Sequence, residues 1–212
     1  MKIVCISDTH SYHHNLLDLP DGDVLVHAGD VSSRGHASEV EDFLIWFNGL
    51  PHPNKIFIAG NHDFLFEENP RAAQQLLDKF PDIIYLENSE AVIEGVKFYG
   101  SPATPWFYDW AFNYQRGDEL RGIWEKIPED TNVLITHGPV YGVLDRVQRD
   151  KSKVGCKDLL ERIKKLKKLS LFVCGHIHES YGTTLLKGVN YVNASICNLQ
   201  YKPIHKPVVV EV

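Results

Sequence analysis

The stretch "KIFIAGNHD" (residues 55–63) joins an apolar segment to a group of polar side chains. The letters "IFIA" form the near-continuous apolar pattern that is typical of a β-strand buried on both faces. Gly60 and Asn61 are common turn residues, because both tolerate a left-handed backbone. A turn alone does not explain why an imidazole and a carboxylate, His62 and Asp63, follow at once. These side chains have a chemical role only if other parts of the chain supply partners for them.

Four more apolar segments, "KIVCIS", "VLVHAG", "NVLIT" and "SLFVC", also predict strands that end in polar residues. The carboxyl ends of parallel strands meet at one edge of a sheet, so the polar side chains there are expected to converge. Packing does not explain five such endings, because buried charges without partners are costly. The residues that follow the five predicted strands are Asp8 and His10, Asp30, Asn61 with His62 and Asp63, His137, and His176 with His178.

The strands alternate with helical patterns. Apolar residues at helical spacing predict a helix in "ASEVEDFLIWFNGL" (residues 37–50), and Pro70 opens a second helix. This alternation favours an α/β fold with parallel strand pairs. The stretch 91–101 predicts a hairpin, residues 118–127 and 156–169 predict helices, and the chain closes with strand patterns. No linker or internal repeat is visible, so we expect one domain over residues 1–212.

Composition narrows the function classes. The chain has 212 residues, 43% of them hydrophobic, which is enough to fill a core. A net charge of -6 argues against broad nucleic-acid binding, so no stable nucleic-acid complex is expected. The four cysteines are scattered, which suits a reducing compartment. The chain begins directly with a strand pattern and contains no membrane-spanning run, so a cytoplasmic protein with no membrane association is expected.

The strand-end residues are metal-ligand types. Carboxylate, imidazole and amide ligands without thiolate suit Mn, Fe, Zn or similar divalent ions. Seven candidate ligands are too many for one ion and about right for two. A shared carboxylate would hold two ions roughly 3.5–4 Å apart, the separation used in two-metal phosphoryl transfer. Asp30, on the second and central strand, is the natural bridge.

The order of the motifs D-x-H, G-D, G-N-H-D, H-G and G-H-x-H resembles that of the calcineurin-like metallophosphoesterases. Here they read "DTH" (8–10), "GD" (29–30), "GNHD" (60–63), "HG" (137–138) and "GHIH" (175–178). Each motif alone is weak, whereas all five in this order are highly specific. The segments "SPATPWFYDWAFN", "THGPVYGVLDRV" and "YGTTLLKGVNYVNAS" are similar to the metallophosphoesterase-domain-containing (fetal-brain-239-like) phosphodiesterase group.

The resemblance implies a four-layer αββα double β-sandwich, with two mixed sheets flanked by helices and a dinuclear site at the strand ends. It implies two divalent ions, Mn²⁺ first, with Fe or Zn as alternatives. By motif position one ion would be held by Asp8, His10, Asp30 and His178. The other would be held by Asp30, Asn61, His137 and His176. Asn61 and His62 would lie beside the substrate phosphate, with His62 as a catalytic group and Asp63 as the partner that sets its tautomer.

The expected function is metal-dependent phosphodiester hydrolysis, in which a metal-activated hydroxide attacks phosphorus and His62 assists the leaving group. A small diester such as a cyclic nucleotide is the favoured substrate. The loops "SDTHSYHHN", "GDVSSRG" and "GNHDFLFEEN" contain one cationic side chain, Arg34, whereas a monoester dianion is usually met by more. A phosphomonoesterase or nuclease remains an alternative. So does a non-catalytic binding protein on the same fold.

Two further features have two interpretations each. The aromatic segment from Trp106 to Tyr114 is either a hydrophobic cap over the smaller sheet or a wall that stacks a nucleobase. Arg146, in the loop after His137, is either a phosphate contact or part of an exposed charged loop.

Overall fold

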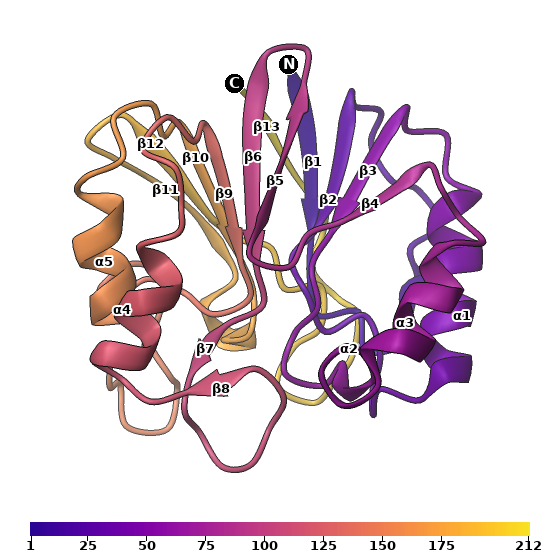
Figure 1. Cartoon of the computed structure of the whole chain (residues 1–212), viewed down its shortest axis with the longest axis horizontal. Helices are drawn as coiled ribbons and strands as arrows, with labels where there is room; N and C mark the ends of the chain where they lie inside the picture. The colour runs from indigo at the N-terminus through magenta and orange to yellow at the C-terminus, as the bar shows by residue number, and fades with distance from the viewer.

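Two β-sheets face each other in the computed structural model, which describes residues 1–212, and helices cover the outer face of each sheet (Figure 1). The first sheet has the order β13-β1-β2-β3-β4, and the second has the order β11-β12-β10-β9-β6-β5. The first sheet comprises β1 (Lys2–Ile6), β2 (Val24–His27), β3 (Asn54–Phe57), β4 (Ile83–Tyr85) and β13 (Val208–Glu211). The second comprises β5 (Ser89–Ile93), β6 (Val96–Ser101), β9 (Val133–Thr136), β10 (Leu171–Cys174), β11 (Gly182–Leu186) and β12 (Val189–Asn193).

The helices lie on opposite sides of the sandwich (Figure 1). The first sheet is covered by α1 (Ala37–Asn48), α2 (Phe64–Glu68) and α3 (Pro70–Leu77). The second is covered by α4 (Asp118–Trp124) and α5 (Lys157–Ile163). Short elements are the 3-10 turns η1 (His13–Asn15) and η2 (His178–Ser180) and the pair β7 (Thr104–Pro105) and β8 (Asn113–Tyr114).

The core consists of three hydrophobic clusters, one between each pair of neighbouring layers. One cluster fills the space between the sheets and includes Ile3, Ile56 and Val173, all without exposed surface. The other two clusters lie between each sheet and its own helices. The fold is therefore the four-layer αββα arrangement that the motif order implied.

Strand directions confirm the expected parallel pairs. β1, β2, β3 and β4 pair in parallel, as do β6, β9, β10 and β12, whereas β13, β5 and β11 pair antiparallel at the sheet edges. Both termini lie at the opposite end of the molecule from the carboxyl ends of the parallel strands (Figure 1), and the Met1 amino group lies 2.7 Å from the Val212 carbonyl oxygen.

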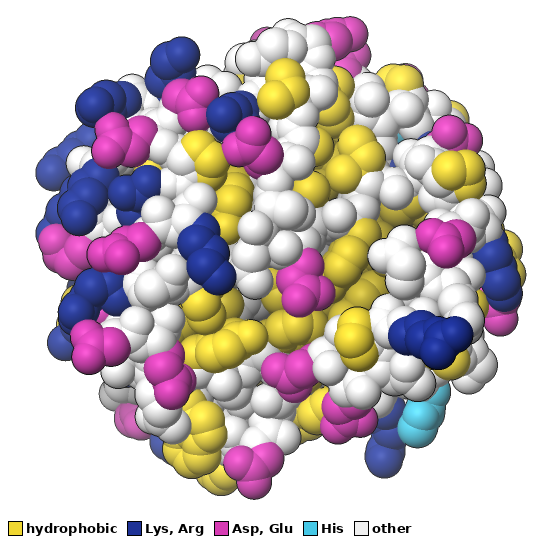
Figure 2. All heavy atoms as spheres, in the orientation of Figure 1, with side chains coloured by type: hydrophobic (Ala, Val, Ile, Leu, Met, Phe, Trp, Pro, Cys, Tyr) yellow, Lys and Arg dark blue, Asp and Glu magenta, His cyan; other side chains and the backbone are white.

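One predicted helix is shorter than expected. The helix predicted over residues 156–169 ends at Ile163, because the next bonds, from the Lys165 and Leu166 amides, reach back only three residues. Lys164, Lys165, Lys167 and Lys168, which follow α5, are exposed, and Lys and Arg side chains gather on this side of the surface view, at its left edge (Figure 2).

Candidate metal centre

The polar residues expected to converge do meet, although their strands belong to two different sheets. β1, β2 and β3 of the first sheet and β9 and β10 of the second all end on the same side of the molecule (Figure 1). A parallel bridge between Ser7 and Ser195 joins the two sheets beside the site. The convergence therefore depends on how the sheets face each other, and not on one sheet edge.

The backbone is left-handed at four candidate ligands. The φ angles are 53° at Asp8, 43° at His10, 55° at Asp30 and 66° at His176. Non-glycine residues adopt this region rarely, and such residues cluster at functional sites where surrounding contacts hold them. The chain thus turns sharply at each strand end and directs these side chains toward one point.

Two motif glycines are required because a carboxylate lies too close to each for a side chain to fit. A Cβ atom on Gly60 would collide with the Asp30 carboxylate, and one on Gly175 would collide with the Asp8 carboxylate. A larger residue at either position would push a carboxylate out of the cluster. This is the physical reason for a glycine next to Asn61 and next to His176.

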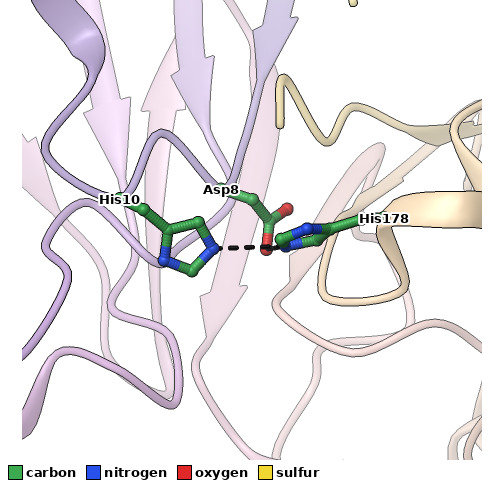
Figure 3. A group of neighbouring side chains, drawn as sticks. All are labelled: Asp8, His10 and His178. Carbon is green, nitrogen blue, oxygen red and sulfur yellow. Dashed lines mark hydrogen bonds and ion pairs between the residues drawn. The ribbon is translucent and has the colours of Figure 1, made fainter. Parts of the chain in front are cut away.

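The first group of ligand atoms belongs to Asp8, His10 and His178 (Figure 3). His10 Nε2 lies 3.2 Å from His178 Nε2, and His178 Nε2 lies 3.4 Å from Asp8 Oδ1. The Asp8 carboxylate is fixed by the Ser195 hydroxyl, which donates to it at 2.7 Å, and by the His176 amide at 3.0 Å.

The second group surrounds Asp30. Asp30 Oδ2 lies 3.3 Å from His137 Nε2 and 3.7 Å from His10 Nε2, so it faces both groups. Asn61 Oδ1 lies 2.9 Å from His137 Nε2. The half-buried ring of His176 packs against His137, with ring centroids 5.1 Å apart, at the edge of this group. The structure therefore brings all seven predicted ligands together, with His176 the most peripheral.

Hydrogen bonds orient the imidazoles toward the centre. His137 Nδ1 lies 2.9 Å from the Ala28 carbonyl oxygen, and His178 Nδ1 lies 3.0 Å from the Asn198 carbonyl oxygen. A carbonyl only accepts, so Nδ1 carries the proton in each ring and Nε2 points at the carboxylates. Metal-binding histidines are commonly fixed in this way.

The charges also fit divalent cations. Asp8 and Asp30 are almost fully buried, and burial by itself would raise the pKa of each carboxyl. The neighbouring histidines outweigh this effect and lower the pKa of both. Conversely, burial disfavours charge on His137 and His178, but Asp30 beside the first and Asp8 beside the second raise the pKa of each to about 9. Two buried carboxylates thus require nearby positive charge, which divalent ions would supply. This donor set of buried carboxylates, imidazoles and an amide suits divalent metal ions.

His62 lies beside the ligands. Its Nδ1 lies 2.8 Å from the Ser33 carbonyl oxygen, so Nδ1 carries the proton and Nε2 is left facing Asp30 Oδ2 at 4.0 Å. The His62 amide also donates to Asp30 Oδ1 at 2.8 Å. The Trp110 ring packs against the imidazole at a centroid distance of 4.4 Å.

The expectation that Asp63 sets the tautomer of His62 is wrong. The Asp63 carboxylate points back into the protein and accepts hydrogen bonds from the Gly60, Val31 and Ser32 amides and from the Ser32 hydroxyl. A backbone carbonyl, that of Ser33, holds the imidazole instead. Asp63 therefore links the loop after β2 to the loop after β3. It affects the site by fixing the conformation of these two loops.

The aromatic segment divides between the core and the site. Ala111 and Phe112 are buried in the cluster between the first sheet and its helices, whereas Trp106, Phe107 and Trp110 line cavities at the site. Phe107 and Trp110 line a cavity of about 300 Å³ that also contains Asp30 and His62. Trp106 lines an adjacent cavity of about 270 Å³. Hydrophobic side chains lie at the lower edge of the surface view, in the region of β7 and β8 (Figure 2). Arg146 lines neither cavity, because its backbone bonds to Ser180 and its guanidinium donates to the Lys151 carbonyl.

Sequence reasoning missed Tyr201. Its ring lies 4.8 Å from that of His10, 5.5 Å from that of His178 and 6.2 Å from that of His62. It reaches the site from the loop after β12 and lines the same cavity as Trp110. No motif flanks it, so only the fold reveals its position.

His27 supports the first ligand loop from inside the core. It has no exposed surface, and its Nε2 lies 2.9 Å from the hydroxyl of Thr9, between Asp8 and His10. Burial lowers the pKa of His27 to about 3. An unfolded histidine titrates near 6.5, so between these values the unfolded chain binds the extra proton.

The free energy of unfolding should therefore fall as the pH drops below about 6.5. Between neutral pH and pH 5.0, His27 should lower the free energy of unfolding by about 2 kcal/mol, and a His27→Gln variant should lack this part of the loss. Urea unfolding of both proteins at pH 7.5 and pH 5.0 measures this. An identical loss of stability in the two proteins on acidification would contradict the assignment.

Taken together, fold and site define a metal-dependent phosphoesterase. A family model described as calcineurin-like phosphoesterase matches residues 1–180, and the chain belongs to this family. The human and mouse proteins named metallophosphoesterase domain-containing protein 1 are each 40% identical to it over 230 residues, covering 99% of this chain and 70% of theirs. A UPF0046 protein of Caenorhabditis elegans is 36% identical over 219 residues, covering 96% and 74%.

Solved structures share the fold. The structure of TT1561 of Thermus thermophilus has a TM-score of 0.64 and 13% identity, covering 91% of this chain and 88% of that one. Another solved chain has a TM-score of 0.73 and 17% identity, covering 99% and 98%. No helix of this chain combines the length and apolar character needed to span a bilayer.

Proposed function

We propose that this phosphoesterase hydrolyses small phosphodiesters, cyclic nucleotides among them, with two divalent ions, most favourably Mn²⁺. The observation that carries the proposal is the place of Asp30, whose Oδ2 faces both His10 and His137. One carboxylate between two groups of ligands is the arrangement a two-ion centre requires. Asp8, His10 and His178 would complete one site. Asn61, His137 and His176 would complete the other.

When bound, two such ions activate a water and neutralise charge on the phosphoryl oxygens. The protein groups supply position and proton transfer. Asn61 and His62 lie where a phosphate at Asp30 would meet them. His62 Nε2 faces the cavity with Nδ1 held by Ser33, so a protonated His62 can give the Nε2 proton to a leaving oxygen.

The charge of the cavity supports a diester. The cavity that contains Asp30 and His62 is lined by no lysine or arginine, and Glu179 adds negative charge. A monoester dianion would meet this surface with one more negative charge than a diester. The adjacent cavity is lined by two cationic side chains. Arg116 already donates to the Val154 and Gly155 carbonyls, and the Lys153 ammonium lies over the Tyr141 ring.

The shape of the site supports a second substituent. The two cavities share Phe107, His176 and Ile177. A substituent attached to a phosphate in one cavity can therefore extend into the other. Trp106 and Phe107 are about half exposed, at 51% and 57%. Stacking on such rings contributes about 1–3 kcal/mol per base.

Comparison of kcat/KM for a bis-aryl and a mono-aryl phosphate, on one Mn-loaded preparation, tests the substrate class. We expect the diester to be favoured by at least about tenfold, equivalent to about 1.4 kcal/mol. Trp106→Ala should raise KM for a cyclic nucleotide and leave that for a small dialkyl diester unchanged. A tenfold monoester advantage would contradict the diester assignment, and an unchanged nucleotide KM would contradict the stacking contact.

The alternatives are less well supported. A nuclease needs a basic surface for its polymer, and the net charge of this chain is -6. A non-catalytic binding protein would have no need for the complete ligand set with His62. We also place the protein in the cytoplasm, because all four cysteines are free and buried, which suits a reducing compartment.

A further inference from the structure

A second group of metal-binding side chains lies outside the candidate metal centre, where η1 meets α1. His13 and His14, at the start of η1, both direct Nε2 at the carboxylate of Asp42 on α1. His13 Nε2 lies 3.1 Å from Asp42 Oδ2, and His14 Nε2 lies 3.2 Å from each carboxylate oxygen. These three residues contribute no atom to the groups around Asp30.

The spacing fits a tetrahedral zinc site. Zinc binds imidazole nitrogen and carboxylate oxygen at about 2.0–2.2 Å, so neighbouring ligand atoms are about 3.3–3.5 Å apart. The distances of 3.1 and 3.2 Å from the imidazoles to Asp42 are close to this value. The ligand atoms of all three residues lie within 4.8 Å of one another. Only a small adjustment is needed to surround one ion.

The environment of His13 is an independent observation. Its ring has no exposed surface and packs against Trp46 and Phe43, at centroid distances of 5.0 and 5.8 Å. Its Nδ1 is buried and has no hydrogen-bond partner, so the ring meets polar groups only through Nε2. Burial, with the charge of His14, lowers the pKa of His13 to about 4, so the ring is neutral at pH 7. A neutral imidazole is the form that binds metals.

We propose that His13, His14 and Asp42 form a second, independent binding site for one Zn²⁺ ion. The side chains of His14 and Asp42 are 58% and 53% exposed, which leaves a fourth position open to solvent. Two imidazoles with one carboxylate favour zinc over the harder Ca²⁺ and Mg²⁺. Bound zinc would link η1 to α1 and so restrain the loop that carries Asp8 and His10.

Zinc stoichiometry tests this proposal without reference to catalysis. Wild type and the variants Asp42→Asn, His14→Ala and Glu41→Gln are loaded with Mn²⁺, dialysed against micromolar Zn²⁺ and analysed for bound zinc. Glu41 is the matched control, because it is the neighbouring acid on α1 and pairs with Lys79 instead. Zinc exchange at the main centre is common to all four proteins, so their differences report the new site.

We expect Asp42→Asn and His14→Ala to bind one Zn²⁺ per chain fewer than wild type and Glu41→Gln. Zinc should also raise the melting temperature of wild type and Glu41→Gln by more than that of the other two, because a ligand stabilises the folded state it binds. Equal zinc content and equal thermal shifts in all four proteins would overturn the proposal. Both exchanged side chains are exposed, so misfolding is not expected to obscure the comparison.

Discussion

Replacing Asp30 with asparagine is expected to lower turnover by on the order of 10³-fold and to remove metal from the protein. Lewis-acid stabilisation by bound ions contributes several kcal/mol, and each 1.36 kcal/mol is tenfold in rate. Asp30 Oδ2 lies 3.3 Å from His137 Nε2 and 3.7 Å from His10 Nε2, between the two groups of ligands. A neutral amide lacks the charge to bridge two cations. Elemental analysis after Mn²⁺ loading should give two ions per chain for wild type and one or none for Asp30→Asn.

Asp145→Asn is the matched control for this change. Asp145 is buried as completely as Asp30, but it accepts hydrogen bonds from the Gly142 and Gly155 amides and lies outside the metal groups. This variant should lose stability and keep two ions per folded chain. A wild-type stoichiometry that stays near one under saturating Mn²⁺ would exclude the dinuclear centre, as would an Asp30→Asn protein that retains both ions.

His62→Ala is expected to lower turnover by about 10²–10⁴-fold, the usual contribution of a general acid or base, while metal content stays nearly unchanged. The His62 ring is held by Ser33 and Trp110 and reaches only 4.0 Å from the nearest carboxylate oxygen, that of Asp30. Its Nε2 also lies within one group of possible ligand atoms, with His10 and Asp30, so the metal content of the variant distinguishes proton transfer from a ligand role. Steady-state kinetics with a metal assay on the same samples measures both effects.

A series of diesters with different leaving groups separates proton transfer from simple positioning. A poor leaving group, such as an alkoxide, needs protonation, whereas 4-nitrophenolate does not. The defect of His62→Ala should therefore be largest on the alkyl diester and smallest on the nitrophenyl diester. Full activity on the alkyl substrate, or loss of the metals, would show that His62 is not the acid.

The parallel strands and the order of the strand-end residues could be predicted because both depend on local sequence. A run such as "IFIA" is buried wherever it lies, and turn chemistry marks its end. Very short elements were not predicted. β4 has three residues and α2 has five, which is too few positions to show a period.

The sequence could predict which residues form the site, but not which atoms contact one another there. The identity of Asp8, His10, Asp30 and His137 as candidate ligands follows from their side-chain chemistry and their position after apolar segments. Their division between two sheets does not, because strand patterns carry no information about which sheet a strand joins. The resemblance to a known family implied that arrangement, and the structure confirmed it.

The sequence by itself determined which side chains are available at the strand ends, because residue type and burial are local properties of the chain. Only the tertiary structure decided which atoms meet. Asp63 follows His62 directly, yet its carboxylate turns inward to the loop after β2, and the imidazole bonds to Ser33, 29 residues away. Tyr201 reaches His10 from the far end of the chain. Such contacts depend on how two sheets pack and where their loops cross, and neither leaves a periodic or compositional signal in the residues themselves.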